Sequence, residues 1–327
     1  MISRPMIGEA AARIKGHVRV TPMLDSPFLD EIAGRRVLVK AECLQHTGSF
    51  KFRGGWNAVS ALPGAVRAKG VLAFSSGNHA QGVAAAARAT GVPAIIVMPA
   101  DAPALKIANT KALGAKVVLY DRATENREDV ARRVNEDMTL IRPFDDPMVI
   151  AGQGTLGLEL LEQTKDVCGG PADVLVCCGG GGLTGGVALA LEGSDLCARP
   201  VEPEGFDDVA RSLISGRREV NTRTHGSLCD AILAPGPGKI TFPVMRAHCG
   251  SGLVVTEAEA LRAMALAFNR LKIVVEPGGA VALAAALFHP DEIQGDVVIA
   301  VATGGNVDSA VFRLALDQFG GTGQAFP

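Results

Sequence analysis

Short apolar segments recur along the chain, and their apolar residues run almost continuously instead of alternating with polar ones. The clearest segments are residues 35–41, 70–76, 94–99, 115–120, 173–178 and 296–303. Such β-branched runs predict strands of a sheet that is covered on both faces. Between them lie alanine-rich segments with helical spacing, such as 78–91 and 155–164. This order predicts parallel βαβ units, in which ligands bind where the strands end.

Composition narrows the class of partner. The 327 residues suit two domains or one large α/β domain. A net charge of -2, one Trp and one Tyr argue against nucleic-acid and membrane-surface partners. The seven cysteines form no CxxC pair, so disulfides and a thiolate zinc site are disfavoured and a reducing compartment fits. Neither a signal-peptide core nor a membrane-spanning apolar stretch is present in the sequence. We therefore expect a cytoplasmic protein that acts on a small molecule.

Lys51 stands between Phe50 and Phe52 in the segment QHTGSFKFRGG, residues 45–55. The two rings would bury its stem, and burial lowers the pKa of a lysine enough to make its amine a usable nucleophile or base. The alternative is a lysine at the start of a helix that reaches past two core aromatics to water. The segment alone favours this structural alternative.

Three glycine-containing loops follow predicted strands: 75–82, 177–186 and 301–308. In the first, SSGNHAQG, the free N–H groups of a helix start could hold a carboxylate or phosphate, or Ser and Asn could simply cap the helix. In the second, CCGGGGLTGG, four glycines let the backbone approach a ligand closely, which favours phosphate over packing alone. The third, VATGGNVD, presents the hydroxyl of Thr303, which could hydrogen-bond a ring nitrogen; a simple turn is the alternative.

A buried lysine, a phosphate cradle without a nucleotide fingerprint and a hydroxyl at a strand end fit pyridoxal phosphate. The motifs TGSFKFRGG, SSGNHAQG, IAGQGT, GGGGLTGG, EPGGAVA and TGGNVD occur in that order. With them the whole chain resembles the fold-type II pyridoxal-phosphate enzymes, in the branch of threonine/serine dehydratases, serine racemases and 3-hydroxyaspartate dehydratases. The resemblance implies a two-lobed α/β fold like tryptophan synthase β, each lobe a mainly parallel sheet flanked by helices. Residues 1–65 and 150–327 would form the large cofactor-binding domain, and 66–149 a small mobile domain that closes over the substrate.

The resemblance also implies roles for individual residues. Lys51 would anchor the cofactor and act as the catalytic base, with Ser76 as a second catalytic candidate. The expected cofactor contacts are Phe50, Lys51, Asn78, Gly179, Gly180, Gly181, Gly182, Leu183 and Thr303. Among these, the glycines would cradle the phosphate, Asn78 would bond the phenolic oxygen and Thr303 would face the ring nitrogen. Substrate contacts are expected from Ser75, Ser76, His79 and Arg127.

A divalent cation is a further expectation from the resemblance. Glu202, the backbone carbonyl of Phe206 and Asp208 match positions where the racemase and hydroxyaspartate enzymes bind a cation. All-oxygen ligation suits Mg²⁺, Mn²⁺ or Ca²⁺. The alternative is a solvated acidic loop.

The resemblance implies β-elimination from a β-hydroxy amino acid (3-hydroxyaspartate, threonine or serine) to a 2-oxo acid and ammonia, in a homodimer. Serine racemase is the alternative, although residues 233–242 lack the serines that racemase relatives carry in that loop. A non-catalytic protein with the same fold is a third hypothesis, disfavoured by the intact lysine and glycine loop. A second substrate carboxylate would need a cation, for which Arg127, His79, His46 and Lys239 are candidates.

Overall fold

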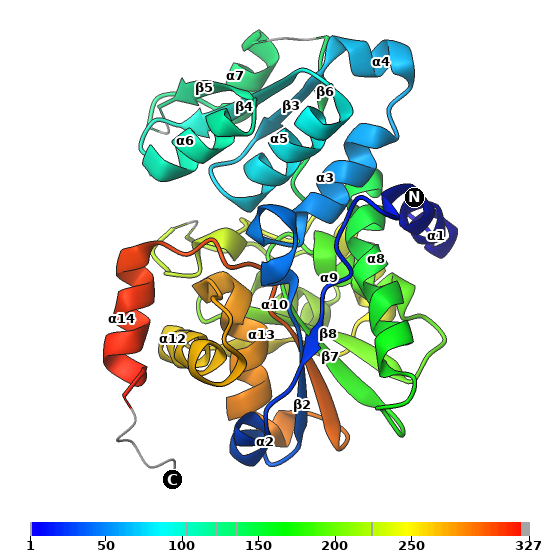
Figure 1. Ribbon diagram of the computed structural model, residues 1–327, viewed down its shortest axis with the longest axis vertical. Coiled ribbons are helices and arrows are strands. Elements are labelled where there is room, and N and C mark those ends of the chain that lie inside the picture. The colour runs from blue at the N-terminus through cyan, green and yellow to red at the C-terminus, as the bar shows by residue number, and fades with distance from the viewer. Residues whose placement is uncertain (1, 103, 122, 135–136, 224, 322–327) are drawn as a thin grey trace.

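The chain forms two separate sheets in a computed structural model that describes residues 2–102, 104–121, 123–134, 137–223 and 225–321 (Figure 1). The larger sheet has the strand order β1-β2-β10-β7-β8-β9. Its strands are β1 (Met23–Leu24), β2 (Arg36–Lys40), β7 (Ala172–Cys177), β8 (Leu196–Pro203), β9 (Leu253–Val255) and β10 (Val297–Val301). β1 pairs antiparallel with β2, and the other pairings are parallel.

The smaller sheet is parallel and has the order β5-β4-β3-β6. Its strands are β3 (Val71–Phe74), β4 (Ala94–Pro99), β5 (Lys116–Tyr120) and β6 (Thr139–Leu140). The predicted strands are thus all present, as β2, β3, β4, β5, β7 and β10, and the expected α/β fold with two parallel-sheet lobes is confirmed. All strands of the smaller sheet lie within 66–149, while the limits of the two domains and their mobility stay predictions.

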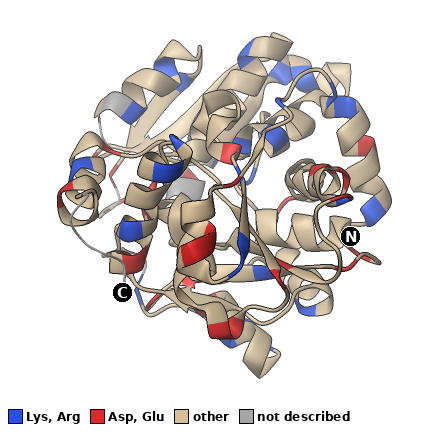
Figure 2. Ribbon diagram, turned by 60° about the horizontal axis from the view of Figure 1, so that its bottom comes forward, with Lys and Arg blue, Asp and Glu red and all other residues tan. Residues whose placement is uncertain are grey.

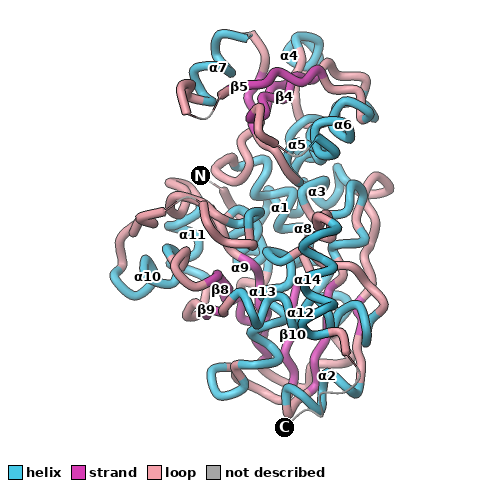
Figure 3. The backbone as a smooth tube through the Cα atoms, turned by 90° about the vertical axis from the view of Figure 1, so that its left-hand side faces the viewer, coloured by secondary structure: helices cyan, strands magenta, loops and turns pink. Residues whose placement is uncertain are grey.

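Helices surround both sheets, and Figure 3 shows the two lobes at opposite ends of the molecule with α3 between them. The first seven are α1 (Arg4–Ile14), α2 (Pro27–Ala33), α3 (Lys51–Ser60), α4 (Gly64–Lys69), α5 (Asn78–Thr90), α6 (Ala104–Ala112) and α7 (Arg127–Val134). The others are α8 (Pro147–Thr164), α9 (Gly182–Ala190), α10 (Asp208–Ser215), α11 (Thr241–His248), α12 (Glu257–Leu266), α13 (Pro277–Phe288) and α14 (Ser309–Phe319). Residues 277–287 of α13 are all buried, as expected for a helix that is apolar on every side.

Charged residues of both signs are distributed over the helices of both lobes (Figure 2). This mixture fits the net charge of -2. Within the described residues, no helix has the length and apolar character needed to cross a membrane.

Helix α3 packs between α5 of the smaller lobe and α8 of the larger one, and glycines allow both contacts. A Cβ atom at Gly55 would lie 2.9 Å from the carbonyl oxygen of Gly82 in α5. On the other side, a Cβ atom at Gly152 of α8 would lie 2.8 Å from the carbonyl oxygen of Arg53. These distances are too short for any side chain, so Gly55 of α3 and Gly152 of α8 are required by helix packing.

A buried ion network fixes α3 to the larger lobe. The guanidinium of Arg53, which is 0% exposed, donates from Nε and Nη2 to Glu42 at 2.8 and 2.7 Å. It also donates from Nη1 and Nη2 to Glu159 of α8 at 2.7 and 2.9 Å. Lys40, at the end of β2, donates to the same Glu159 at 2.7 Å. Each buried charge therefore has a partner, and the network holds the start of α3 in place.

Candidate active site

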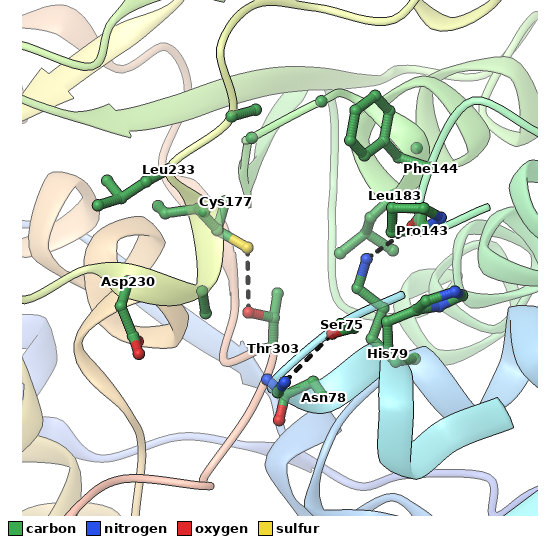
Figure 4. A pocket seen from close by; sticks show the side chains of 18 of the residues that line it. Ser75, Asn78, His79, Pro143, Phe144, Cys177, Leu183, Asp230, Leu233 and Thr303 are labelled. Carbon is green, nitrogen blue, oxygen red and sulfur yellow. Dashed lines mark hydrogen bonds between the residues drawn. The ribbon is translucent and has the colours of Figure 1, made fainter. Parts of the chain in front are cut away.

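A cavity of about 250 Å³ lies where β3, β7 and β10 end (Figure 4). This is the edge of a parallel sheet at which ligands are expected. Most of the predicted site residues line it together: Phe50, Lys51, Ser75, Ser76, Asn78, His79, Gly179, Gly180, Gly181, Gly182, Leu183 and Thr303. They come from separate segments of the chain, so the fold is what assembles them.

Lys51 is the first residue of α3, and its half-buried side chain lines the cavity. The amine donates a hydrogen bond to the carbonyl oxygen of Pro143 at 2.8 Å. Burial lowers the pKa of Lys51 to about 8, against the smaller opposing influence of Cys177 and Glu276. A substantial fraction of this amine is therefore neutral near neutral pH, as a nucleophile or base requires.

The glycine loop leads from β7 into α9 and turns tightly at Gly181, whose φ is +87°. The carbonyl oxygen of Gly180 accepts hydrogen bonds from the N–H of Gly238 at 3.1 Å and from the hydroxyl of Thr241 at 2.6 Å. A Cβ atom at Gly180 would overlap the ring of Phe144. The first N–H groups of α9 have no partner within the helix, and the loop presents them beside Lys51. This arrangement fits the phosphate group of a cofactor.

Asn78 and Glu276 form a hydrogen-bonded pair in the same cavity. Asn78 donates from Nδ2 to Glu276 Oε1 at 2.5 Å, and its Oδ1 accepts from Asn306 Nδ2 at 2.7 Å. Burial raises the pKa of Glu276 to about 7. Sequence reasoning missed Glu276, although it opens the motif EPGGAVA and its position before a proline at a helix start was a readable signal.

Thr303 follows β10, and its hydroxyl lies 3.0 Å from Cys177 Sγ at the end of the neighbouring strand β7 (Figure 4). Both side chains are buried. The structure thus adds a thiol partner for Thr303 that the sequence did not predict. Burial raises the pKa of Cys177 to about 11, so this thiol is neutral. The hydroxyl of Thr303 is therefore the more polar group of the pair.

His79 differs from one of its predicted roles. Its ring Nε2 lies 2.9 Å from the carbonyl oxygen of Ile141. Because a carbonyl only accepts, Nε2 carries the hydrogen and Nδ1 is left with a lone pair, without a partner in the described part of the structure. Burial and then the charge of Lys51 lower the pKa of His79 to about 3. The imidazole is neutral, so the hypothesis that His79 supplies a cation is wrong.

The other predicted cations lie away from the cavity or outside the described side chains. His46 packs edge-on against Phe52, with ring centroids 5.0 Å apart, and Lys239 is exposed; neither is among the described lining residues. Arg127 is the first residue of α7, but its side chain lies outside the described part of the structure. Lys106 of α6, which the sequence analysis did not single out, lines the cavity instead.

Two of the predicted metal ligands, Glu202 and Asp208, lie close enough for the charge of Asp208 to act on Glu202. Glu202, near the end of β8, accepts hydrogen bonds from the N–H groups of Val209 and Ala210 at 3.0 and 2.7 Å. Asp208 begins α10, and its Oδ2 is buried without a partner among the described groups. Burial raises the pKa of Asp208 to about 6, and burial followed by the nearby Asp208 raises that of Glu202 well above its ordinary value.

Two adjacent buried carboxylates and an orphaned oxygen fit a hard divalent cation. Among the described residues, no group of three or more His, Cys, Asp or Glu side chains is placed to hold a metal. A cation here would therefore also need oxygen from the backbone, for which the buried Phe206 between the two carboxylates is the candidate.

Comparison with known proteins gives consistent results. The family described as "Pyridoxal-phosphate dependent enzyme" matches residues 14–304. An L-threo-3-hydroxyaspartate ammonia-lyase from Pseudomonas sp is 46% identical over 92% of this chain and 94% of that protein. A serine racemase from Oryza sativa subsp. indica is 39% identical over 93% of this chain and 91% of that protein. The crystal structure of a threonine deaminase from T.th. has a TM-score of 0.87 and 44% identity, covering 94% of this chain and 99% of that one.

Proposed function

The chain belongs to the family of pyridoxal-phosphate dependent enzymes, and from this premise we propose that it is an ammonia-lyase. Its substrate is a β-hydroxy amino acid (3-hydroxyaspartate, threonine or serine), and its products are a 2-oxo acid and ammonia. The observation that carries the proposal is the amine of Lys51 in one cavity with the glycine loop and Thr303. The 46% identity to an L-threo-3-hydroxyaspartate ammonia-lyase supports the choice of reaction.

The residues that would hold pyridoxal phosphate are those already assembled around the cavity. Lys51 would bind the aldehyde carbon, the backbone of residues 179–183 would bind the phosphate, and Asn78 would bind the phenolic oxygen. When bound, the cofactor supplies an electron sink that stabilises negative charge at the substrate α-carbon. Phe50, whose ring centroid is 5.1 Å from the amine of Lys51, would cover this reacting region and exclude water.

Proton transfers fall to two side chains. The amine of Lys51 takes the proton from the α-carbon, and its lowered pKa keeps enough of it neutral to do so. The β-hydroxyl leaves with a proton, for which the Ser76 hydroxyl in the cavity wall is the available donor from the chain. Thr303 would face the cofactor ring with a neutral hydroxyl and no negative charge, and this weaker stabilisation of the ring nitrogen would favour rapid loss of the β-hydroxyl.

Serine racemase is the second candidate, because Ser76 lines the same cavity and could act as a second acid or base. Racemisation returns a proton to the opposite face of the α-carbon and retains the β-hydroxyl. The loop 233–242 lacks serine, which weighs against this alternative.

We also propose a divalent cation at Glu202, Phe206 and Asp208. A hydrogen-bond path connects this cluster to the active site: Asn221 donates to Asp208 Oδ1 at 2.5 Å and to the carbonyl oxygen of Ala234 at 2.9 Å. Ala234 lines the cavity. A bound cation would therefore order the wall of the cavity as well as neutralise the two carboxylates.

The assembly is proposed to be a homodimer in the cytoplasm, with residues 66–149 closing over the substrate. The family resemblance supports the dimer, and seven unpaired cysteines support a reducing compartment.

The proposal is tested by release of 2-oxo acid and ammonia from purified, cofactor-loaded protein. L-threo-3-hydroxyaspartate and its isomers, threonine and serine are supplied in parallel, with Lys51→Ala as the inactive control. Stoichiometric release of both products from at least one substrate is expected. Formation of D-serine from L-serine without 2-oxo acid would establish the racemase instead, and silence on every substrate would contradict both activities.

A further inference from the structure

Lys106 brings a cation into the active-site cavity from the smaller lobe. It lies in the first turn of α6, and its ammonium is 3.3 Å from Asp230 Oδ2. Asp230 belongs to a different lobe, at the start of a 3-10 turn spanning Asp230–Ile232. Both side chains line the cavity, and Figure 4 shows Asp230 on the opposite side of it from His79.

Lys106 is the cation that the cavity can offer to a ligand. The described cavity wall contains two cationic side chains, Lys51 and Lys106, and Lys51 is assigned to the cofactor. His79 is neutral. The charge of Lys106 also acts on Glu276, where it opposes the burial that raises the pKa of that carboxyl. The field of Lys106 therefore reaches the interior of the cavity as well as its mouth.

The present partner of Lys106 is easily exchanged. The side chain of Asp230 is 64% exposed and that of Lys106 is 23% exposed. An ion pair this open to water contributes little to stability, and Asp230 can turn into solvent when another carboxylate arrives. After this exchange the ammonium of Lys106 is still paired with a carboxylate. The new carboxylate takes a position that is less exposed to solvent than that of Asp230.

The position of Lys106 suits a ligand with two carboxylates. The segment that carries Ser75, Ser76 and His79, expected to contact the substrate carboxylate, follows β3, and α6 follows β4. These two strands are hydrogen-bonded neighbours in parallel register, with Phe74 opposite Val97, and such strands lie about 4.8 Å apart. Ser75, Ser76 and Lys106 all line the same cavity, so the smaller lobe offers two carboxylate sites to one ligand, one at the N-terminus of α5 and one at Lys106.

We propose that Lys106 is the specificity-determining residue that binds the second carboxylate of a hydroxylated dicarboxylic amino acid, and that Asp230 occupies its place when substrate is absent. This inference rests on the proposed ammonia-lyase function and identifies its substrate class as dicarboxylic. Serine and threonine lack the second carboxylate, so they leave the Lys106–Asp230 pair intact.

The test compares holoenzyme of the wild type with Lys106→Met, Lys106→Arg and the control Lys111→Met. Lys111 lies on the same helix but is exposed, so its loss removes the same charge away from the cavity. For Lys106→Met, kcat/KM for L-threo-3-hydroxyaspartate is expected to fall about 10- to 100-fold, the size of a lost charged hydrogen bond. The value for L-serine or L-threonine should change less than about threefold, and Lys106→Arg should recover part of the loss.

A binding measurement separates this inference from the proposed function. Succinate, an unreactive dicarboxylate, is titrated calorimetrically into the same holoenzymes, with butyrate as the monocarboxylate control. Succinate should bind wild type and Lys111→Met but be weakened by Lys106→Met, and the cofactor absorbance should be unchanged in all variants. Equal losses for hydroxyaspartate and serine in Lys106→Met would show a structural role and overturn the inference, as would unchanged succinate binding.

The two ideas fail in different ways. If the wild type converts serine or threonine but not hydroxyaspartate, the ammonia-lyase stands and the role of Lys106 is refuted. If no amino acid is converted, the proposed function fails, while the succinate titration still decides whether Lys106 binds a second carboxylate.

Discussion

The buried carboxylates at the start of α10 predict that divalent cations stabilise the protein in a pH-dependent manner. Asp208 has a pKa of about 6 in the fold, against an ordinary value of 3.8. A pKa that is raised on folding stabilises the protein at low pH, and this stabilisation is lost as pH rises from about 4 through about 6. The difference of about two between the folded and the ordinary pKa of Asp208 corresponds to ~3 kcal/mol of folding free energy. A cation competes with the proton, so it can recover this free energy only where Asp208 is ionised.

The assay is thermal unfolding in saturating MgCl₂, MnCl₂ or CaCl₂ against EDTA, below and above the pKa of about 6. Well above it, the cation should raise Tm by roughly 5 °C, since ~1 kcal/mol corresponds to about 2–4 °C in chains of 150–250 residues and to less in longer ones. At about pH 5 the response should be much smaller. Asp208→Asn should abolish the response while leaving the metal-free protein as stable as the wild type or more so above neutrality.

Asp207→Asn is the matched control, because Asp207 is adjacent in the chain but forms a partly exposed pair with Arg211. It should retain the full response to cation. The reasoning is refuted if Asp208→Asn responds like the wild type, or if the wild-type response is equal on both sides of the pKa.

Two further predictions concern the cofactor cradle and the support of α3. Gly180→Ala should weaken binding of pyridoxal phosphate at least about 10-fold in an absorbance titration of apoprotein, because its Cβ overlaps Phe144; Gly185→Ala, in ordinary contact, should bind normally, and equal affinities would contradict the cradle. Arg53→Met should lower the free energy of unfolding in urea by ~3–5 kcal/mol, because it leaves the buried carboxylate of Glu42 without its cation and leaves Glu159 with Lys40 alone. The exposed Arg132→Met should cost less than about 0.5 kcal/mol, and similar costs for both would show that the buried network contributes nothing specific.

The strands that sequence reasoning identified share one physical property. β2, β3, β4, β5, β7 and β10 are mainly apolar runs of four to six residues. Burial on both faces of a sheet leaves that signature in most of them, whereas β5, at the sheet edge, has no fully buried residue. The strands without a predicted counterpart are β8, whose eight residues are interrupted by Arg199, Glu202 and two prolines, β1 and β6, with two residues each, and β9, with three. Such short strands are formed by main-chain pairing with a longer neighbour, so their side chains carry no periodic signal.

The proposed cofactor contacts that line the cavity were predictable because each lies within a sequence motif, and all except Phe50 and Lys51 follow a strand end. Lys106 and Asp230 were not, because no local pattern marks either residue. They are 124 positions apart, and only the packing of the two lobes brings them together. Likewise, the neutrality of His79 depends on its burial and on the carbonyl of Ile141, which sequence proximity does not reveal.

The glycines of α3 have a consequence for how this fold can diversify. Gly55 contacts the backbone of α5, while Gly54 would place a Cβ 2.9 Å from the carbonyl oxygen of Val149 in α8. At these glycines the helix backbones meet directly, so no side chain there can be repacked after an exchange of parts. The two lobes are therefore not interchangeable modules. A chimera that takes residues 66–149 from a distant relative must preserve the close backbone contact between α5 and α3. Otherwise it will displace α3, and with it Lys51 at the start of that helix.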